Sequence, residues 1–184
     1  MTIEVMNPHG MKRISKKLSY VLRHDPASIG VTVDAAGWID IDTLLAALTR
    51  HGTTVSRQQL DAVVATNDKQ RFTIDAERIR ANQGHSITVD LGLKARVPPA
   101  RLFHGTATTR LASILDTGLR RGTRHHVHLS TDTATAAKVG SRHGIPAVLT
   151  IDAAGMHDHG HEFFVSANGV WLVDSVPATY LTAQ

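Results

Sequence analysis

Two consecutive prolines, at positions 98 and 99, separate two halves of the 184-residue chain whose apolar residues follow different patterns. Before the pair, most apolar residues recur at helical spacing, whereas after it they gather in short runs that are typical of strands. Successive prolines favour an extended, stiff backbone, so they suit a linker better than the interior of a helix or sheet. The sequence therefore predicts two domains, residues 1–95 and 100–184.

The first half reads as three helices, a short strand and a β-hairpin. An amphipathic helix is predicted over 11–23, ending before Pro26 because the residue that precedes a proline avoids the α region. A short strand follows at 37–41, and Asp42 or Thr43 is expected to cap the next helix. A third helix begins at Ser56, with Gln59 completing a capping box, and a polar turn at 67–70 leads into the hairpin. This order predicts a winged-helix lobe, a class that usually binds nucleic acid.

The second half reads as many short strands with two early helices, which indicates an α+β domain rather than a parallel doubly wound sheet. A further strand is expected just before the prolines, from Val89 to Leu93, where apolar and polar residues alternate. The strands and helices expected after the prolines are strands at 102–106, 127–130, 147–152, 163–165 and 170–174, and helices at 108–115 and 132–139.

Composition excludes several classes of function. The chain has no cysteine, so disulfides, thiolate nucleophiles and cysteine zinc sites are excluded. No early segment resembles a signal peptide, and no apolar run approaches the ~20 residues that a membrane-spanning helix needs. We therefore expect a cytoplasmic protein with no membrane partner, and a monomer. The chain has no heptad repeat to supply the dimerisation element that symmetric operator binding would need. The net charge of +4 permits a polyanionic partner.

Histidine motifs in the second half carry the first functional hypothesis. His104-Gly105-Thr106 ends a predicted strand, and its glycine would let a ligand approach the backbone closely. His128 and Ser130 lie in a later strand, and Asn168 comes near the end of the chain. This order resembles the ADP-ribosyltransferase superfamily over about the last 85 residues, which implies an ADP-ribosyltransferase-like mixed β lobe that binds NAD⁺.

Four longer strings extend the resemblance to nearly the whole chain. Together they resemble the KptA-type RNA 2′-phosphotransferase family from about Ile14 to Leu181. The strings are Leu-Arg-His-Asp-Pro at 22–26, Gln-Arg-Phe at 70–72, Ile-Arg-Ala-Asn-Gln-Gly-His-Ser at 79–86 and Arg-His-His-Val-His-Leu-Ser at 124–130.

The resemblance implies roles for individual residues. The family's catalytic Arg-His-Arg-Arg set falls on Arg23, His24, Arg71 and Arg124. Its NAD⁺ pocket falls on His104, Gly105, Thr106, His128, Ser130 and Asn168. The loop Asn82, Gln83, Gly84 and His85 is expected to face RNA or phosphate. Guanidinium groups suit such a site because their paired donors match the oxygens of a phosphate, so no metal is expected.

The implied reaction moves an internal RNA 2′-phosphate to NAD⁺, which acts as a co-substrate. A 2′-phosphate at a tRNA-like splice junction attacks NAD⁺, and RNA joined to ADP-ribose is the intermediate. The products are RNA with a 2′-hydroxyl, nicotinamide and ADP-ribose 1″,2″-cyclic phosphate. Many protein-modifying ADP-ribosyltransferases place a glutamate near the last motif. Here Asn168-Gly169-Val170 stands instead, which suits an acceptor that is already an anion.

Less specific interpretations compete for the same residues. Arg23 and His24 could simply compensate a helix dipole, and Arg71 could be a solvated strand residue. His126 and His128 alternate along a strand with no third ligand placed by spacing, so zinc is not expected. His157, His159 and His161 read as a surface loop.

Two other functions also compete. One is an ADP-ribosyltransferase that leaves ADP-ribose on a nucleic-acid phosphate end or on a protein. The other is a non-enzymatic winged-helix regulator that binds DNA, with a second half that only senses a nucleotide.

Overall fold

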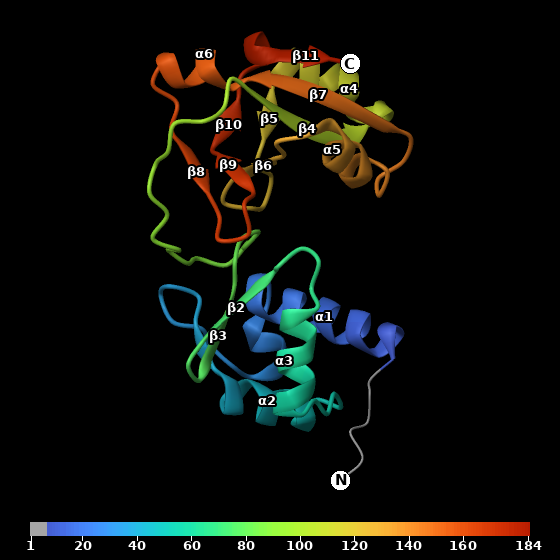
Figure 1. Ribbon diagram of the computed structural model, residues 1–184, viewed down its shortest axis with the longest axis vertical. Coiled ribbons are helices and arrows are strands. Elements are labelled where there is room, and N and C mark those ends of the chain that lie inside the picture. The colour runs from blue at the N-terminus through green and yellow to red at the C-terminus, as the bar shows by residue number, and fades with distance from the viewer. Residues whose placement is uncertain (1–6) are drawn as a thin grey trace. The chain divides into compact units, whose positions relative to one another are not determined.

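The computed structural model describes residues 7–184, which belong to two compact units, one up to Gly92 and one from Leu93 onward (Figure 1). Every strand pair in the two units is antiparallel. The described residues form six α-helices and several small sheets, so the predicted mixed α+β class is confirmed. None of the helices in residues 7–184 has the length and apolar character that a membrane span requires.

The first unit combines three α-helices with one small sheet. The helices are α1 (Pro8–Arg23), α2 (Ile41–Arg50) and α3 (Arg57–Ala65), and a short 3₁₀ turn, η1 (Pro26–Ile29), follows α1. The sheet has the order β1-β3-β2, formed by β1 (Ile39–Asp40), β3 (Arg78–Ala81) and β2 (Phe72–Asp75). The predicted hairpin is therefore present as β2 and β3.

Helix α1 is held at both ends by local chemistry. The Asn7 side chain accepts a hydrogen bond from the Gly10 N–H at 2.8 Å, which caps the start, and the helix ends at Arg23, as Pro26 predicts. The residues that α1 buries are all apolar, whereas Lys12, Arg13 and Lys16 are exposed. The buried residues of α1 are Ile14, Leu18, Val21 and Leu22.

The caps of α2 and α3 test the sequence interpretation directly. Ser56 and Gln59 form the predicted capping box at α3. The prediction for α2 was wrong, because its N-cap is Asp40 and neither Asp42 nor Thr43. Asp40 pairs with Arg78 in the sheet, so its extended backbone lets its carboxylate accept from the Thr43 N–H at 2.8 Å.

The second unit contains two three-stranded sheets and a two-stranded one. The first has the order β11-β7-β4, formed by β11 (Leu181–Ala183), β7 (Pro146–Asp152) and β4 (Arg101–Ala107). The second has the order β6-β9-β8, formed by β6 (Val127–Leu129), β9 (Trp171–Val173) and β8 (Phe163–Val165). Strands β5 (Leu119–Arg120) and β10 (Ser175–Val176) form the small pair.

Helices α4 (Thr108–Thr117) and α5 (Thr133–Gly140) pack against strands β4 and β7, and the short turn η2 (Ala178–Tyr180) contacts α4. Both helices lie where the sequence predicts them, and Gly118 closes α4. The apolar core of this unit draws on β4, β6, β7, β8 and β9, and its buried residues include Leu102, Leu129, Leu149, Ile151, Phe163 and Val173. The strand β4 is thereby fixed by packing and by seven paired residues of β7.

Two local predictions were wrong. The segment from Val89 to Leu93 is irregular and forms no strand. It packs on the loop at 34–38 instead, because the Asp90 N–H donates to the Ala35 carbonyl at 2.7 Å and Val89 is buried.

The supposed surface loop at 157–161 begins inside a helix, α6 (Ala153–Asp158). The Asp152 carboxylate caps this helix by accepting from the Gly155 N–H at 3.0 Å. His159 and His161 pack beside Tyr180, whose hydroxyl lies 2.9 Å from His159 Nδ1.

Candidate active-site residues

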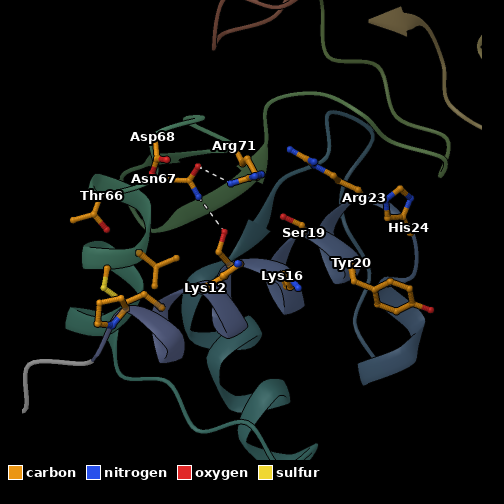
Figure 2. A pocket seen from close by; sticks show the side chains of 14 residues that line it. Lys12, Lys16, Ser19, Tyr20, Arg23, His24, Thr66, Asn67, Asp68 and Arg71 are labelled. Atoms are coloured by element: carbon orange, nitrogen blue, oxygen red, sulfur yellow. Dashed lines mark hydrogen bonds between the residues drawn. The ribbon is translucent and has the colours of Figure 1, made fainter. Parts of the chain in front are cut away.

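Three of the four predicted catalytic residues lie in the first unit, and all three line one groove (Figure 2). Arg23 and His24 come from the last turn and C-cap of α1, and Arg71 comes from the residue before β2. Figure 2 shows Arg23 and Arg71 reaching toward the same part of this groove from its two sides. The structure therefore brings together two guanidinium groups and an imidazole that are separated by up to 48 positions in the sequence.

The end of α1 is also the docking point of a later loop. The Arg23 carbonyl accepts from the Ser86 N–H at 2.9 Å, and the Ser86 hydroxyl lies 2.9 Å from His24 Nδ1. The contact with the Ser86 hydroxyl engages Nδ1 of the His24 ring and holds the ring at the end of α1. His24 is exposed. Its ring is therefore accessible to a bound substrate, which a group that exchanges a proton with that substrate requires.

Arg71 is oriented by Asn67, a residue that the sequence analysis placed only in a polar turn. The Asn67 Oδ1 accepts from Arg71 Nη1 at 3.0 Å, and its Nδ2 donates to the Ser15 hydroxyl at 3.0 Å, as the dashed lines of Figure 2 mark. Asn67 is 9% exposed, so its amide is shielded from competing water. It ties the guanidinium of Arg71 to helix α1 and acts as a positioning residue.

Replacing Asn67 with alanine is expected to weaken binding of a nucleoside 2′-phosphate about tenfold, because Arg71 loses the acceptor that orients it. Calorimetric titration measures this affinity. The same substitution in an Arg71→Ala background should cost little more, since the interaction that it removes is already absent. Equal losses in the two backgrounds would show that Asn67 does not act through Arg71.

The predicted RNA-facing loop at 82–85 is mostly inside the first unit. Asn82 is buried, and its side chain donates to the Gln70 carbonyl and accepts from the Thr73 hydroxyl, both at 2.6 Å. His85 is also buried, whereas Gln83 and Gly84 are half-buried. The loop thus holds the start of β2, next to Arg71. Its role toward RNA stays a prediction.

In the second unit, the predicted NAD⁺ residues meet where β4 and β6 join. Phe103 and Ser130 exchange two backbone hydrogen bonds of 2.8 Å, which place the end of β6 beside β4. His104 Nδ1 lies 3.0 Å from the carbonyl oxygen of His128. The structure therefore brings His104, His128 and Ser130 together.

The contact with His128 fixes the tautomer of His104. A carbonyl oxygen only accepts, so Nδ1 must carry the proton that it donates. Burial lowers the pKa of His104 from its usual 6.5, and the positive charges of Arg124 and His143 lower it further, against the opposing effect of the hydrogen bond. At neutral pH the ring is therefore neutral, and Nε2 is an acceptor for a hydroxyl of a bound ligand.

The lowered pKa of His104 predicts a pH-dependent stability. The contribution of His104 to the free energy of unfolding is fully present above pH 6.5, the pKa of an unperturbed histidine. It is lost as the pH falls toward the lower pKa of His104 in the folded state. His104→Asn should therefore lose less stability than the wild type between about pH 7.5 and about pH 5.5. Chemical denaturation at both pH values measures the difference. His126, whose pKa burial also lowers, should account for part of the loss that remains.

Gly105 has a structural role that the sequence analysis did not foresee. A Cβ at this position would overlap the backbone carbonyl of Ala136 and approach the Gly140 nitrogen, at 2.9 Å. Gly140 reciprocally faces the Thr106 backbone. The space beside Gly105 is thus filled by helix α5 and is not left open for a ligand, although its assigned part in NAD⁺ binding stays a prediction. Thr106 is buried in the same contact.

Asn168 lies in the turn between β8 and β9. Its side-chain oxygen accepts from the Ser166 hydroxyl at 2.8 Å, and the Gly169 N–H closes the turn on the Ser166 carbonyl at 2.9 Å. Because Leu129 pairs with Trp171, this turn and Ser130 lie at the same end of their sheet. Strand register therefore places Asn168 at the edge that carries Ser130.

Arg124 is exposed on the loop that precedes β6. Its charge lowers the pKa of His104, so the two side chains are within electrostatic reach of one another. The fourth predicted catalytic residue is therefore associated with the predicted NAD⁺ residues inside the second unit.

Comparisons with known proteins agree with the motifs. Residues 9–175 match the family described as RNA 2′-phosphotransferase, Tpt1 / KptA family. A probable RNA 2′-phosphotransferase of Streptomyces coelicolor is 56% identical over 169 residues, covering 92% of this chain and 93% of the relative. Proteins of the same description from Burkholderia lata and Nostoc punctiforme are 55% and 50% identical, covering 92% and 96% of this chain and 89% and 98% of the relatives.

These matches define a transferase that acts on the 2′-phosphate of RNA. The chain belongs to the RNA 2′-phosphotransferase, Tpt1 / KptA family. The resemblance inferred from the four sequence strings is thereby confirmed.

Proposed function

We propose that this chain transfers an internal RNA 2′-phosphate to NAD⁺, releasing RNA with a 2′-hydroxyl, nicotinamide and ADP-ribose 1″,2″-cyclic phosphate. Membership of the family supports the removal of the phosphate. The observation that carries the proposal in the structure is the shared groove of Arg23, His24 and Arg71. A 2′-phosphomonoester beside a phosphodiester is a dense anion, and two guanidiniums supply the paired donors that bind and orient it.

The architecture of each unit supports the division of labour that the resemblance implies. The first unit has the order helix, strand, helix, helix, hairpin, with β1 added to the hairpin, which is the arrangement expected of a winged helix. We assign it the RNA. We assign the NAD⁺ to the second unit, as an ADP-ribosyltransferase-like lobe, on the basis of its two antiparallel sheets joined at β4 and β6.

The residues of the second unit fit a dinucleotide chemically. Neutral His104 presents Nε2 as an acceptor for a ribose hydroxyl, and Ser130 and Asn168 add polar groups at the neighbouring sheet edge. No carboxylate stands at Asn168, where a glutamate would activate a neutral acceptor. The acceptor in this proposal is the phosphate itself, which needs no base to become a nucleophile.

In the first step, an oxygen of the RNA 2′-phosphate attacks the ribose carbon that bears nicotinamide. The carbon–nitrogen bond breaks, nicotinamide leaves with the bonding electrons, and the RNA is joined to ADP-ribose through the phosphate. Arg23 and Arg71 orient the nucleophile, so the protein contributes chiefly by position.

In the second step, the 2″-hydroxyl of the transferred ribose attacks phosphorus and closes the cyclic phosphate. The 2″-hydroxyl gives up its proton, the bond from phosphorus to the RNA 2′-oxygen breaks, and that oxygen takes up a proton, so the step gains and loses no net proton. Negative charge develops on the phosphoryl oxygens, which Arg71 and Arg124 stabilise. We assign delivery of the proton to His24, which is exposed, lines the groove and is held at the end of α1 by its contact with Ser86.

Release of nicotinamide from NAD⁺ in the presence of different RNAs tests the proposal. RNA that carries an internal 2′-phosphate should release one nicotinamide per phosphate lost, whereas the same RNA with a 2′-hydroxyl should release none. An ADP-ribosyltransferase for nucleic-acid ends or proteins would release nicotinamide without loss of the 2′-phosphate. A DNA-binding regulator would release none with either RNA, and both outcomes would refute the proposal.

A further inference from the structure

The groove that holds Arg23, His24 and Arg71 is much longer than a single phosphate requires. Its volume is about 820 Å³, within the range that accommodates a whole drug-sized molecule. One wall is helix α1 from Pro8 to His24, and the other runs from Val63 at the end of α3 to Arg71 (Figure 2). Arg23 and His24 lie where α1 ends, and Arg71 is tied through Asn67 to Ser15 in the middle of this helix. The part of the groove beside the first turns of α1, lined by Pro8, Met11 and Lys12, therefore has no assigned part in the proposed reaction.

The α1 wall carries a regular stripe of basic and hydroxyl groups. Lys12, Lys16, Ser19 and Arg23 recur at intervals of four, three and four residues, which places them on one face of the helix. At about 1.5 Å per residue the stripe extends roughly 16 Å along the helix axis. A phosphate bound at Arg23 thus has further cations aligned beside it at successive helical turns.

The lysines of this stripe are available to an anion. Lys12 and Lys16 are exposed, and within residues 7–184 no ion pair joins either ammonium group to a carboxylate. Asp68 is the acidic residue of the lining, against Lys12, Lys16, Arg23 and Arg71. The groove therefore carries a net positive charge along its length.

An aromatic ring is interleaved with these cations. Tyr20 is 47% exposed, lies one turn from Lys16 and one turn from His24, and also lines the groove. Its ring centroid is 6.3 Å from that of His24, and its hydroxyl donates to Asp25 at 3.2 Å, which fixes the ring at the surface. A surface that binds single-stranded nucleic acid combines two features. Cations lie along the sugar–phosphate backbone, and an exposed aromatic ring stacks on a base.

Resting on the proposed function, we propose that the nucleotides flanking the 2′-phosphate lie along α1. Lys12 and Lys16 contact the phosphates of the flanking strand, and a base stacks on Tyr20. The ligand is single-stranded RNA continuous with the bound 2′-phosphate, because the stripe leads directly into Arg23. An acidic peptide would pair with the lysines, but it has no base that stacks on the ring of Tyr20.

Equilibrium binding without NAD⁺ tests this assignment with two RNAs, a 2′-phosphorylated dinucleotide and a longer single strand containing the same phosphate. Each of Lys12→Ala and Lys16→Ala should weaken binding of the longer RNA about two- to fivefold more than that of the dinucleotide. Each should also reduce the slope of log affinity against log salt for the longer RNA by about 0.7. Tyr20→Leu should weaken the longer RNA without changing that slope, because stacking releases no counterions.

Arg13→Ala is the matched control, since Arg13 is an exposed cation of the same helix that does not line the groove. It should leave the ratio of the two affinities unchanged. If the lysine variants left this ratio and the salt slope as in the wild type, or if polyglutamate displaced the longer RNA as well as competitor RNA did, the assignment would be overturned. Failure of the proposed function is separate, because it would appear as absence of NAD⁺-dependent turnover even with the dinucleotide.

Discussion

Arg124→Ala and Arg71→Ala are each expected to make ADP-ribosylated RNA accumulate during the reaction. Removing a group that stabilises developing charge typically slows the step concerned by about 10²–10³. Negative charge develops on phosphoryl oxygens mainly in the second step, so cyclisation should be slowed far more than attack on NAD⁺. Single-turnover kinetics with end-labelled RNA resolve substrate, intermediate and product and give both rate constants.

Two exposed arginines provide the controls for these variants. Arg120→Ala removes a cation from the segment that leads to Arg124, and Arg50→Ala removes one from the last turn of α2. Neither has a role in the proposed reaction, and neither should allow the intermediate to build up. Equal slowing of both steps by Arg124→Ala would mean that this residue only binds substrate and does not act in the transition state.

Gly105→Ala is expected to destabilise the second unit by about 3 kcal/mol or more, at or above the upper end of the usual cost of overpacking. The added methyl would overlap the Ala136 carbonyl, and backbone of helix α5 cannot move aside as a flexible side chain can. In a Trp38→Phe background, Trp171 is the remaining tryptophan and lies in β9 of this unit. Its fluorescence during denaturant unfolding therefore reports the stability of the second unit alone.

Gly122→Ala separates this clash from the ordinary cost of replacing a glycine. Gly122 has a φ of +62° and no neighbouring atom within 4 Å of the added methyl. Its substitution should cost only about 1 kcal/mol, from backbone strain. A loss at Gly105 no larger than the loss at Gly122 would contradict the close packing of β4 on α5.

Local signals were sufficient for most of the helices. Pro26 predicts the end of α1, and Ser56 with Gln59 predicts the start of α3, because each depends on residues within one turn. The sequence did not identify Asp40 as the cap because Asp42 and Thr43 are also residue types that suit an N-cap. Pairing of Asp40 with the distant residue Arg78 gives Asp40 the cap position instead of either of them. The alternation at Val89–Leu93 misled the prediction, since a strand also needs a partner and this segment packs on a loop.

The motifs identified the groove residues Arg23, His24 and Arg71, but the groups that position them depend on contacts across the chain. Asn67 orients Arg71 through a bond to Ser15, which is 52 positions away, so no local pattern indicates it. The sequence analysis assigned the space beside Gly105 to a ligand, whereas in the structure the neighbour is helix α5. Sequence motifs thus identify which residues carry the chemistry, whereas the residues that position them are found only from contacts in the folded chain.

The fate of the phosphorus atom decides whether this chain is a transferase to NAD⁺. RNA labelled at its 2′-phosphate should convert only when NAD⁺ is supplied, with all of the released label recovered in ADP-ribose 1″,2″-cyclic phosphate. Label released as inorganic phosphate, or released without the dinucleotide, would instead establish a phosphatase and contradict the account.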